Sequence, residues 1–147
     1  MDRFSCGFLA GIIGAVVMDV WSFISHSFLS YAELQFLDWA SVLLFGRLPA
    51  NMVETVISLL AHIAWTGVIG IILAYLMPLI TARQYLYKGA LLGFVFGFMF
   101  LAIPIIFNVN SLNSHATGTV VTVIIGSLLW GIVTMLFLRS SDVSPNN

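Results

Sequence analysis

The sequence contains little charge. Only 7% of its 147 residues are Asp, Glu, Lys or Arg, and the formal net charge is −1. A soluble domain carries about 25% charged residues, whereas 61% of this chain is hydrophobic. So few charges cannot cover a water-facing surface, and the composition therefore predicts an integral membrane protein. The small net charge offers no basic field for a nucleic acid and no acidic tail for a basic partner.

Groups that carry common chemistries are also scarce. Cys6 is the single cysteine, which excludes an intrachain disulfide and a cysteine-based metal cage. The sequence has no HExxH, GxSxG, Walker or CxxC motif. We therefore expect no cofactor and no metal, and an enzyme is the least favoured class of function.

Four apolar stretches are long enough to cross a bilayer, which takes about 20 residues. They cover residues 4–28, 53–80, 86–107 and 116–138. The first is interpreted as a retained span rather than a secretory signal, because its apolar run is long, contains Asp19 and lacks a small-x-small cleavage site. The sequence thus predicts an all-α, four-helix transmembrane bundle that forms a single membrane domain over residues 1–147.

The few basic residues predict an orientation. Arg3, Arg83, Lys88 and Arg139 flank the spans on one side of the membrane, and Arg47 alone lies on the other. The positive-inside rule then places both termini in the cytoplasm, with the protein in the cell membrane.

A shorter helix is predicted between the first two spans, over about 31–45. Ser30 and Glu33 have capping-box spacing, and Gly46 offers a left-handed C-cap before Pro49. On a helical projection the polar and apolar side chains form two arcs: Gln35, Asp38 and Ser41 on one, and Phe36, Trp39, Ala40, Leu43 and Leu44 on the other. This pattern is typical of an amphipathic helix in the outer membrane interface.

Glycine repeats predict how the spans pack. Gly7 and Gly11 in the first span, and Gly89, Gly93 and Gly97 in the third, recur at four-residue spacing. Such ridges let two helix backbones approach closely. Contact within one bundle is the first interpretation, and homo-oligomerisation is the alternative. A shared Gly-x-Leu-x-Gly pattern also hints at a duplicated two-helix unit.

Asp19 places a carboxylate near the middle of the first span. A charge at that depth costs about 2.5–3.5 kcal/mol on insertion scales, so such residues are candidate functional groups. It shares a helix face with Ser22 and His26. In the second span a polar stripe follows i, i+4 and i+8 spacing: Glu54, Ser58 and His62.

The two stripes are expected to meet. In antiparallel spans Asp19 and His62 lie at nearly equal depth, each about 5 Å from the middle of its span. Their contact would offset part of the desolvation cost of each group. The other members lead to the outer surface: Ser22, Ser58, His26 and Glu54. We interpret the set as a half-channel for protons or a site for a small cation, and the alternative is a polar contact that only fixes helix register.

Two of these residues have further interpretations. The run Asn51-Met52-Val53-Glu54 is a second capping signal, which gives Glu54 a structural role at the start of its helix. His115, in the polar loop before the fourth span, is expected to be solvated. An outer metal site of His26, Glu54 and His115 is a minor alternative, because nothing in the spacing is diagnostic.

The order of segments resembles that of the YqhR-like small membrane proteins of spore-forming bacteria, a group without an assigned activity. The resemblance is carried by Asp38-Trp39, by Asn51-Met52-Val53 in a different order, by residues 88–93 (Lys-Gly-Ala-Leu-Leu-Gly), and by a fourth span that contains Gly126 and Gly131. It implies a multi-pass bacterial membrane protein. Asp19 and His62 are not among the matching residues.

Two functions therefore remain in view, besides the less favoured enzyme. The first is a non-catalytic membrane component that assembles in the lipid bilayer with itself or with another membrane protein. The second is a transporter or channel subunit that conducts protons or a small cation through the Asp19–His62 pair.

Overall fold

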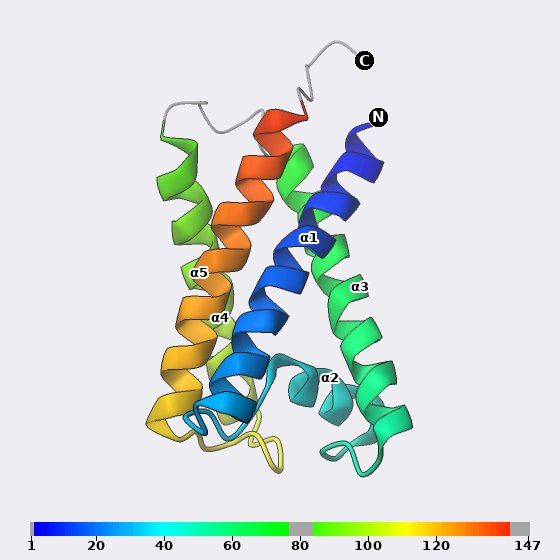
Figure 1. The fold of residues 1–147 in the computed structure, drawn as a ribbon, viewed down its shortest axis with the longest axis vertical. Coiled ribbons are helices and arrows are strands. Elements are labelled where there is room, and N and C mark those ends of the chain that lie inside the picture. The colour runs from blue at the N-terminus through cyan, green and yellow to red at the C-terminus, as the bar shows by residue number, and fades with distance from the viewer. Residues whose placement is uncertain (1, 77–83, 142–147) are drawn as a thin grey trace.

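The computed structural model describes residues 2–76 and 84–141, and all regular elements in these ranges are helical. They are α1 (Arg3–Phe23), the π-helical turn η1 (Ile24–Phe28), α2 (Phe36–Phe45), α3 (Met52–Leu76), α4 (Tyr85–Ile106) and α5 (Thr117–Ser140). The four long helices stand side by side, and α2 lies at one end of them (Figure 1). The all-helical fold predicted from the sequence is confirmed.

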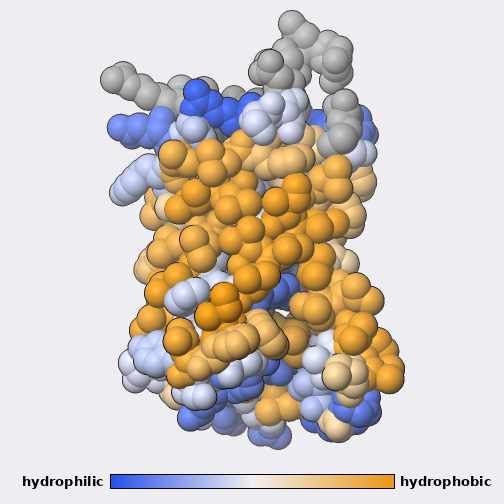
Figure 2. Space-filling model, viewed as in Figure 1, coloured by the Kyte–Doolittle hydropathy of each residue, from blue (hydrophilic) through white to orange (hydrophobic). Residues whose placement is uncertain are grey.

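Four of the described helices are long and apolar enough to cross a membrane: α1 with η1, α3, α4 and α5. Figure 2 shows an apolar belt between two more hydrophilic ends. Such a surface suggests a multi-pass membrane protein, in which backbone polar groups are paired within helices. The helices agree with the predicted spans to within a few residues, and residues 77–80 of the second predicted span lie outside the described ranges.

The long helices pack in the order α3, α1, α5, α4. Within the described ranges the extensive contacts join α1 to α3, α1 to α5 and α4 to α5, while α2 packs on α3. Helices α3 and α4 are not among these pairs. The bundle is therefore an arc with α1 and α5 at its centre and with α3 and α4 as its two ends.

Close backbone approach joins α1 to α3. A Cβ atom added at Gly7 would lie 2.7 Å from the Cα of Ile71, and one added at Gly11 would lie 2.9 Å from the Cα of Gly67. Real Cβ atoms do not approach another atom so closely, so only glycine fits at these positions. The predicted role of this ridge in packing within one bundle is confirmed.

The second glycine ridge joins α4 to α5 in the same way. A Cβ at Gly89 would lie 2.7 Å from the carbonyl oxygen of Gly131, and one at Gly97 would lie 2.6 Å from Ser127 Oγ. Gly93 meets the Cα of Gly131 at 3.3 Å by the same measure. Both predicted ridges are thus used inside the chain.

Hydrogen bonds tie α5 to α1. The indole N–H of Trp130 donates to the carbonyl oxygen of Gly11 at 3.2 Å, and that of Trp21 donates to the carbonyl oxygen of Thr122 at 3.1 Å. The hydroxyls of Ser25 and Thr122 also form a buried hydrogen bond. These contacts give the centre of the arc a polar seam as well as close packing.

Helix α2 begins later than the sequence predicts. Its N-cap is Gln35, whose backbone N–H donates to Asp38 Oδ2 at 2.6 Å. The predicted capping box of Ser30 and Glu33 is wrong, because both residues precede the helix. The Glu33 N–H donates instead to Thr119 Oγ1 of α5 at 3.0 Å. A tertiary contact therefore holds this segment in an irregular conformation.

Side chains of both arcs of α2 are turned toward the protein, since Phe36 and Trp39 of the apolar arc are 2% and 3% exposed. Asp38 and Ser41 are buried, and the Ser41 hydroxyl donates to the carbonyl oxygen of Arg47 at 2.9 Å. The side chain of Leu43 points outward and is 86% exposed. Helix α2 ends at Gly46, which has φ +70°, so the predicted left-handed C-cap is confirmed.

Candidate functional site

Asp19 on α1 and His62 on α3 face each other inside the bundle. Asp19 Oδ1 lies 3.4 Å from His62 Nε2, and the two side chains are 14% and 4% exposed. The contact that the sequence predicts is therefore present. The glycine contacts between α1 and α3 bring the two polar faces together, because they set the distance and the register of the two helices.

No hydrogen bond closes the pair. His62 Nε2, 3.4 Å from Asp19 Oδ1, has no hydrogen-bond partner among the described residues. Six buried side-chain atoms have no hydrogen-bond partner among the described residues, and four of them belong to the facing stripes of α1 and α3: Asp19 Oδ2, Ser22 Oγ, Ser58 Oγ and His62 Nε2. Buried polar atoms are almost always paired, and an unpaired one costs about 1–3 kcal/mol. We refer to Asp19, Ser22, Ser58 and His62 as the polar centre.

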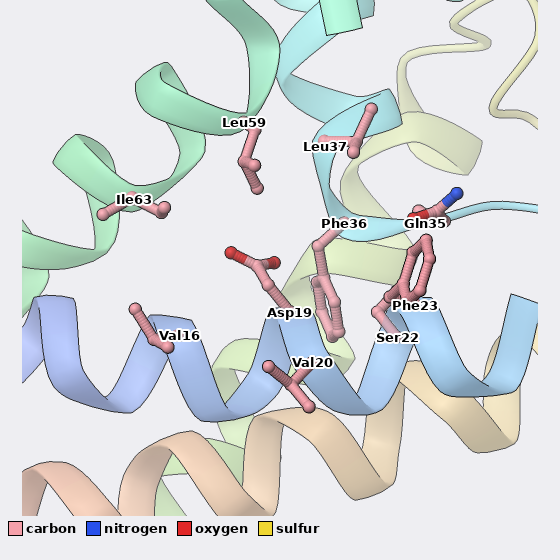
Figure 3. A pocket seen from close by; sticks show the side chains of 10 residues that line it. All are labelled: Val16, Asp19, Val20, Ser22, Phe23, Gln35, Phe36, Leu37, Leu59 and Ile63. Carbon is pink, nitrogen blue, oxygen red and sulfur yellow. The ribbon is translucent and has the colours of Figure 1, made fainter. Parts of the chain in front are cut away.

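A cavity of about 320 Å³ opens beside Asp19. In Figure 3 the carboxylate projects from α1 toward α3, where Leu59 and Ile63 lie. The lining is largely apolar and includes Val16 and Val20, which are 48% and 54% exposed. The cavity therefore opens on the lateral face of the bundle at α1. Figure 2 shows a hollow with a hydrophilic patch in the lower part of the apolar belt.

Aromatic side chains enclose the polar centre. Phe36 of α2 stacks on the His62 imidazole with ring centroids 5.6 Å apart, and it also lines the Asp19 cavity. Phe100 of α4 meets the same imidazole edge-on at 6.4 Å. Helix α2 thus places an apolar ring over His62, and this ring is itself only 2% exposed.

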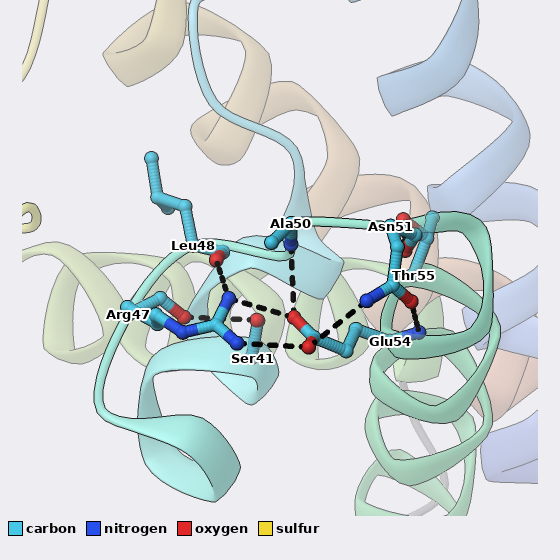
Figure 4. A network of polar contacts seen from close by, with 7 residues as sticks. All are labelled: Ser41, Arg47, Leu48, Ala50, Asn51, Glu54 and Thr55. Atoms are coloured by element: carbon cyan, nitrogen blue, oxygen red, sulfur yellow. Dashed lines mark hydrogen bonds and ion pairs between the residues drawn. The ribbon is translucent and has the colours of Figure 1, made fainter.

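His26 and Glu54 have other partners. His26 Nδ1 lies 2.9 Å from the carbonyl oxygen of Ala32. Glu54 accepts two hydrogen bonds from the Arg47 guanidinium, at 2.8 Å each, and its N–H donates to Asn51 Oδ1 at 3.0 Å (Figure 4). The hydrogen bonds and the charge of Glu54 raise the pKa of Arg47 above its ordinary value. The predicted capping role of Glu54 is confirmed, and its part in a polar pathway stays a prediction.

His115 is not fully solvated, contrary to the expectation. It is half-buried, its ring lies 5.7 Å from that of Trp39, and its Nε2 lies 3.4 Å from the carbonyl oxygen of Leu101. Leu112 anchors this loop, since it is 2% exposed. Within residues 2–76 and 84–141 no three His, Cys, Asp or Glu side chains are placed to hold a metal ion, so the outer metal site of His26, Glu54 and His115 is not formed.

Sequence reasoning missed the buried hydroxyls of α5. Thr119, Thr122 and Thr134 are at most 1% exposed. Thr119 accepts from the Glu33 N–H, and the Thr134 hydroxyl donates to the carbonyl oxygen of Ala10 at 3.4 Å. The threonines lie on one face of α5, where polar or small residues recur every three or four positions and where a glycine and a tryptophan continue the pattern. This spacing could have identified, from the sequence, the side of α5 that meets α1.

Comparison of the chain with protein-family models, with curated proteins and with solved structures finds no match. The resemblance to YqhR-like proteins stays a prediction. The arguments on function therefore depend on the geometry of the polar centre and of the helices around it.

Proposed function

We propose that this multi-pass membrane protein binds and moves a proton, or a small cation, at the Asp19–His62 pair. The observation that carries the proposal is the polar centre, with its four buried polar atoms that lack hydrogen-bond partners in the described part of the chain. A pair that only fixed helix register would be most stable with a closed hydrogen bond. Acidic and imidazole side chains inside a membrane are the usual members of proton relays.

The chemistry of the site favours a proton over a metal cation. Oxygen-ligated cations take six or more ligands, whereas the oxygen atoms here come from one carboxylate and two hydroxyls. Asp19 and His62 can share a single proton, because a carboxylic acid donates and an imidazole nitrogen accepts. Exchange with water requires that Phe36, which stacks on the imidazole, moves aside. Helix α2 would then act as a cover over the site.

The direction of entry follows from the proposed orientation. Arg3 and Arg139 lie at the end of the bundle opposite α2, over the rings of Tyr75 and Tyr85 at 5.8 and 3.9 Å. We place this end, and with it both termini, in the cytoplasm of a cell whose cytoplasmic membrane holds the protein. Helix α2 and the Asp19 cavity then lie toward the outer surface, and protons would enter from there.

Proton flux into liposomes tests the proposal. Purified protein is reconstituted with an internal pH dye, and a potassium diffusion potential drives proton entry. We expect flux above that of empty liposomes, at least a tenfold loss in Asp19→Asn, and no change in Asp2→Asn, which removes a carboxylate at the far end of α1. Wild-type flux equal to that of empty liposomes, or full flux in a folded Asp19→Asn variant, would overturn the proposal.

A component that assembles with itself or with another membrane protein is the second proposal. The short connections leave the apolar lateral surface as the main area open to a partner (Figure 2). The glycine ridges, for which homo-oligomerisation was the alternative interpretation, are occupied within the chain. Light scattering of the detergent-solubilised protein decides on self-assembly: a monomer at all concentrations would exclude a stable homo-oligomer.

A further inference from the structure

The Asp19 cavity opens sideways, on a part of α1 that lies within the apolar belt. Val16, Val20 and Phe23 line the cavity and are 48%, 54% and 53% exposed. All three belong to a helix that is long and apolar enough to cross a membrane, so in a bilayer their exposed faces meet acyl chains rather than water. A molecule dissolved in the bilayer can therefore enter the cavity from the side.

The carboxylate of Asp19 can be reached from this cavity. The side chain of Asp19 keeps 14% of its surface exposed. Its Oδ2 atom is buried, whereas Oδ1 is not, although Oδ1 also has no hydrogen bond within the described residues. An occupant of the cavity can therefore contact Asp19 at Oδ1, and Figure 2 shows a hydrophilic patch inside the hollow.

The cavity offers one carboxylate and no basic side chain. Among the described residues that line it, Asp19 is charged, Ser22 and Gln35 are polar, and the others are apolar. His62, the titratable side chain that faces Asp19, is 4% exposed and does not line the cavity. A carboxylate in apolar surroundings is costly unless it is paired. The cavity is therefore complementary to a single positive charge.

The lining favours an organic cation over a metal ion. Oxygen-ligated metal cations take six or more ligands, whereas Asp19, Ser22 and Gln35 provide the only side-chain oxygens among the described lining residues. An organic ammonium group needs no such shell, and the apolar body attached to it gains from contact with Leu59 and Phe23. An aromatic ring such as that of Phe23 also attracts a cation within about 6 Å of its centre.

The size of the cavity fits a small molecule. Its volume is about 320 Å³, which lies at the lower end of the roughly 300–1,000 Å³ found for small-molecule sites. From Val16 to Phe23 the α1 wall is about 10 Å long at 1.5 Å per residue. A mostly apolar pocket with a few placed polar groups is also the usual composition of such sites.

We propose that the Asp19 cavity binds a lipophilic organic monocation, whose ammonium group pairs with the Asp19 carboxylate and whose apolar body lies along α1. The proposal rests on the proposed function in one respect: a proton and the cation compete for the same carboxylate. Binding is measured at equilibrium, without flux. Cation binding by a protein that shows no proton flux would therefore overturn the proposed transport alone.

Equilibrium dialysis with radiolabelled benzyltrimethylammonium tests the charge pair. The protein is held in phosphatidylcholine nanodiscs, and empty nanodiscs give the background. We expect saturable binding by the wild type and at least about a tenfold loss of affinity in Asp19→Asn, the effect of removing one partner of a buried charge pair. Asp2→Asn, at the far end of α1, should bind like the wild type.

Competition distinguishes the organic cation from its alternatives. Neopentylbenzene has the same shape with carbon in place of the charged nitrogen, and it should compete at least about tenfold less well than unlabelled benzyltrimethylammonium. Binding should also weaken as the pH falls from about 9 to about 5, because a proton then occupies Asp19. Equal competition by neopentylbenzene, or displacement by Na⁺ at the same concentration as the cation, would overturn the proposal.

A matched pair of variants tests the location. Leu59→Trp places a large ring in the cavity and should abolish binding, whereas Leu60→Trp, at a 61% exposed position on the same helix, should leave binding unchanged. Circular dichroism checks that both variants are folded. Full binding by a folded Leu59→Trp variant, or by Asp19→Asn, would show that the cation binds elsewhere and would overturn the proposal.

Discussion

Trp130 of α5 donates its indole N–H to the carbonyl oxygen of Gly11 on α1, 3.2 Å away. Gly11 also lies against Gly67 of α3, where an added Cβ would approach to 2.9 Å. One glycine is therefore the point at which three of the four long helices meet. The stability of the arc depends on this point, because α1 is the helix that links α3 to the other two.

Trp130→Phe removes the donor to Gly11 while an aromatic ring remains. We expect the free energy of unfolding in detergent to fall by about 1 kcal/mol, the usual effect of one hydrogen bond. Trp65→Phe is the control, since Trp65 is 63% exposed and should tolerate the change. Thermal unfolding of both variants provides the measurement, and equal losses would contradict the role of the Gly11 contact.

Gly11→Leu should disrupt the contact of α1 with α3. A side chain at this position must push against the α3 backbone, so we expect a loss above about 3 kcal/mol or failure to fold. Val17→Leu on the same helix adds volume at a 36% exposed position and should change little. Circular dichroism melts in detergent measure both variants, and a stable Gly11→Leu protein would show that the helices can separate at low cost.

Asp19→Asn should leave the protein as stable as the wild type or more stable. The substitution keeps the shape of the side chain and removes the charge of the carboxylate. The Oδ2 atom of Asp19 is buried and has no hydrogen-bond partner within the described residues. Retention of such a carboxylate at a cost to the fold is typical of a functional residue. The midpoint of thermal unfolding checks this, and a loss of about 1 kcal/mol or more would make the ionised pair a structural one.

Asp38 should make the stability depend on pH. Burial raises the pKa of this carboxyl above its ordinary 3.8, against the smaller opposing effects of the Gln35 N–H and of His26. The folded state thus binds the proton more tightly than the unfolded state does. The stabilisation is complete below pH 3.8 and is lost as the pH rises through the raised pKa.

Comparison with Asp38→Asn isolates this effect from other titrating groups. We expect the melting temperature of the wild type, relative to the variant, to fall as the pH is raised from about 4 to about 7. A difference that stays constant over this range, or that rises, would contradict the shift.

Labelling with a membrane-impermeant maleimide checks the proposed orientation. In a Cys6→Ala background, a cysteine at Leu48 beside α2 should react in intact cells, and a cysteine at Ser141 after α5 should react only after lysis. Both positions are exposed in the structure. The reverse pattern would place the termini outside and would reverse the proposed direction of proton entry.

The sequence predicts the spans and their glycine contacts well, because both follow from local rules. Hydrophobic length defines a span, and Gly7 with Gly11 mark a helix face that admits close contact with another backbone. The Asp19–His62 contact was predictable for a related reason: two antiparallel helices of known length bring residues of equal depth together. What the residue pattern could not show is that the pair stays at 3.4 Å without closing.

Local rules failed where distant residues compete for the same groups. Helix α2 begins after Gln35 and not after Ser30, because the Glu33 N–H bonds to Thr119 of α5 and the Gln35 N–H bonds to Asp38. The prediction for His115 failed for a similar reason. A residue in a polar loop was expected to be solvated, but the His115 ring packs against the ring of Trp39. In both cases the deciding partner is distant in sequence.

The central place of α1 also has a consequence for biosynthesis. Trp130 and Gly11 are 119 residues apart, so at 5–20 residues per second the donor is made roughly ten seconds after its acceptor. Once α3 has been made, and until α5 follows, α1 can pair with α3 but not with α5. Its second face, with Gly14 and Ser25, must be sheltered by lipid or by the insertion machinery in the meantime. Of the four described spans, the first is completed only by the fourth.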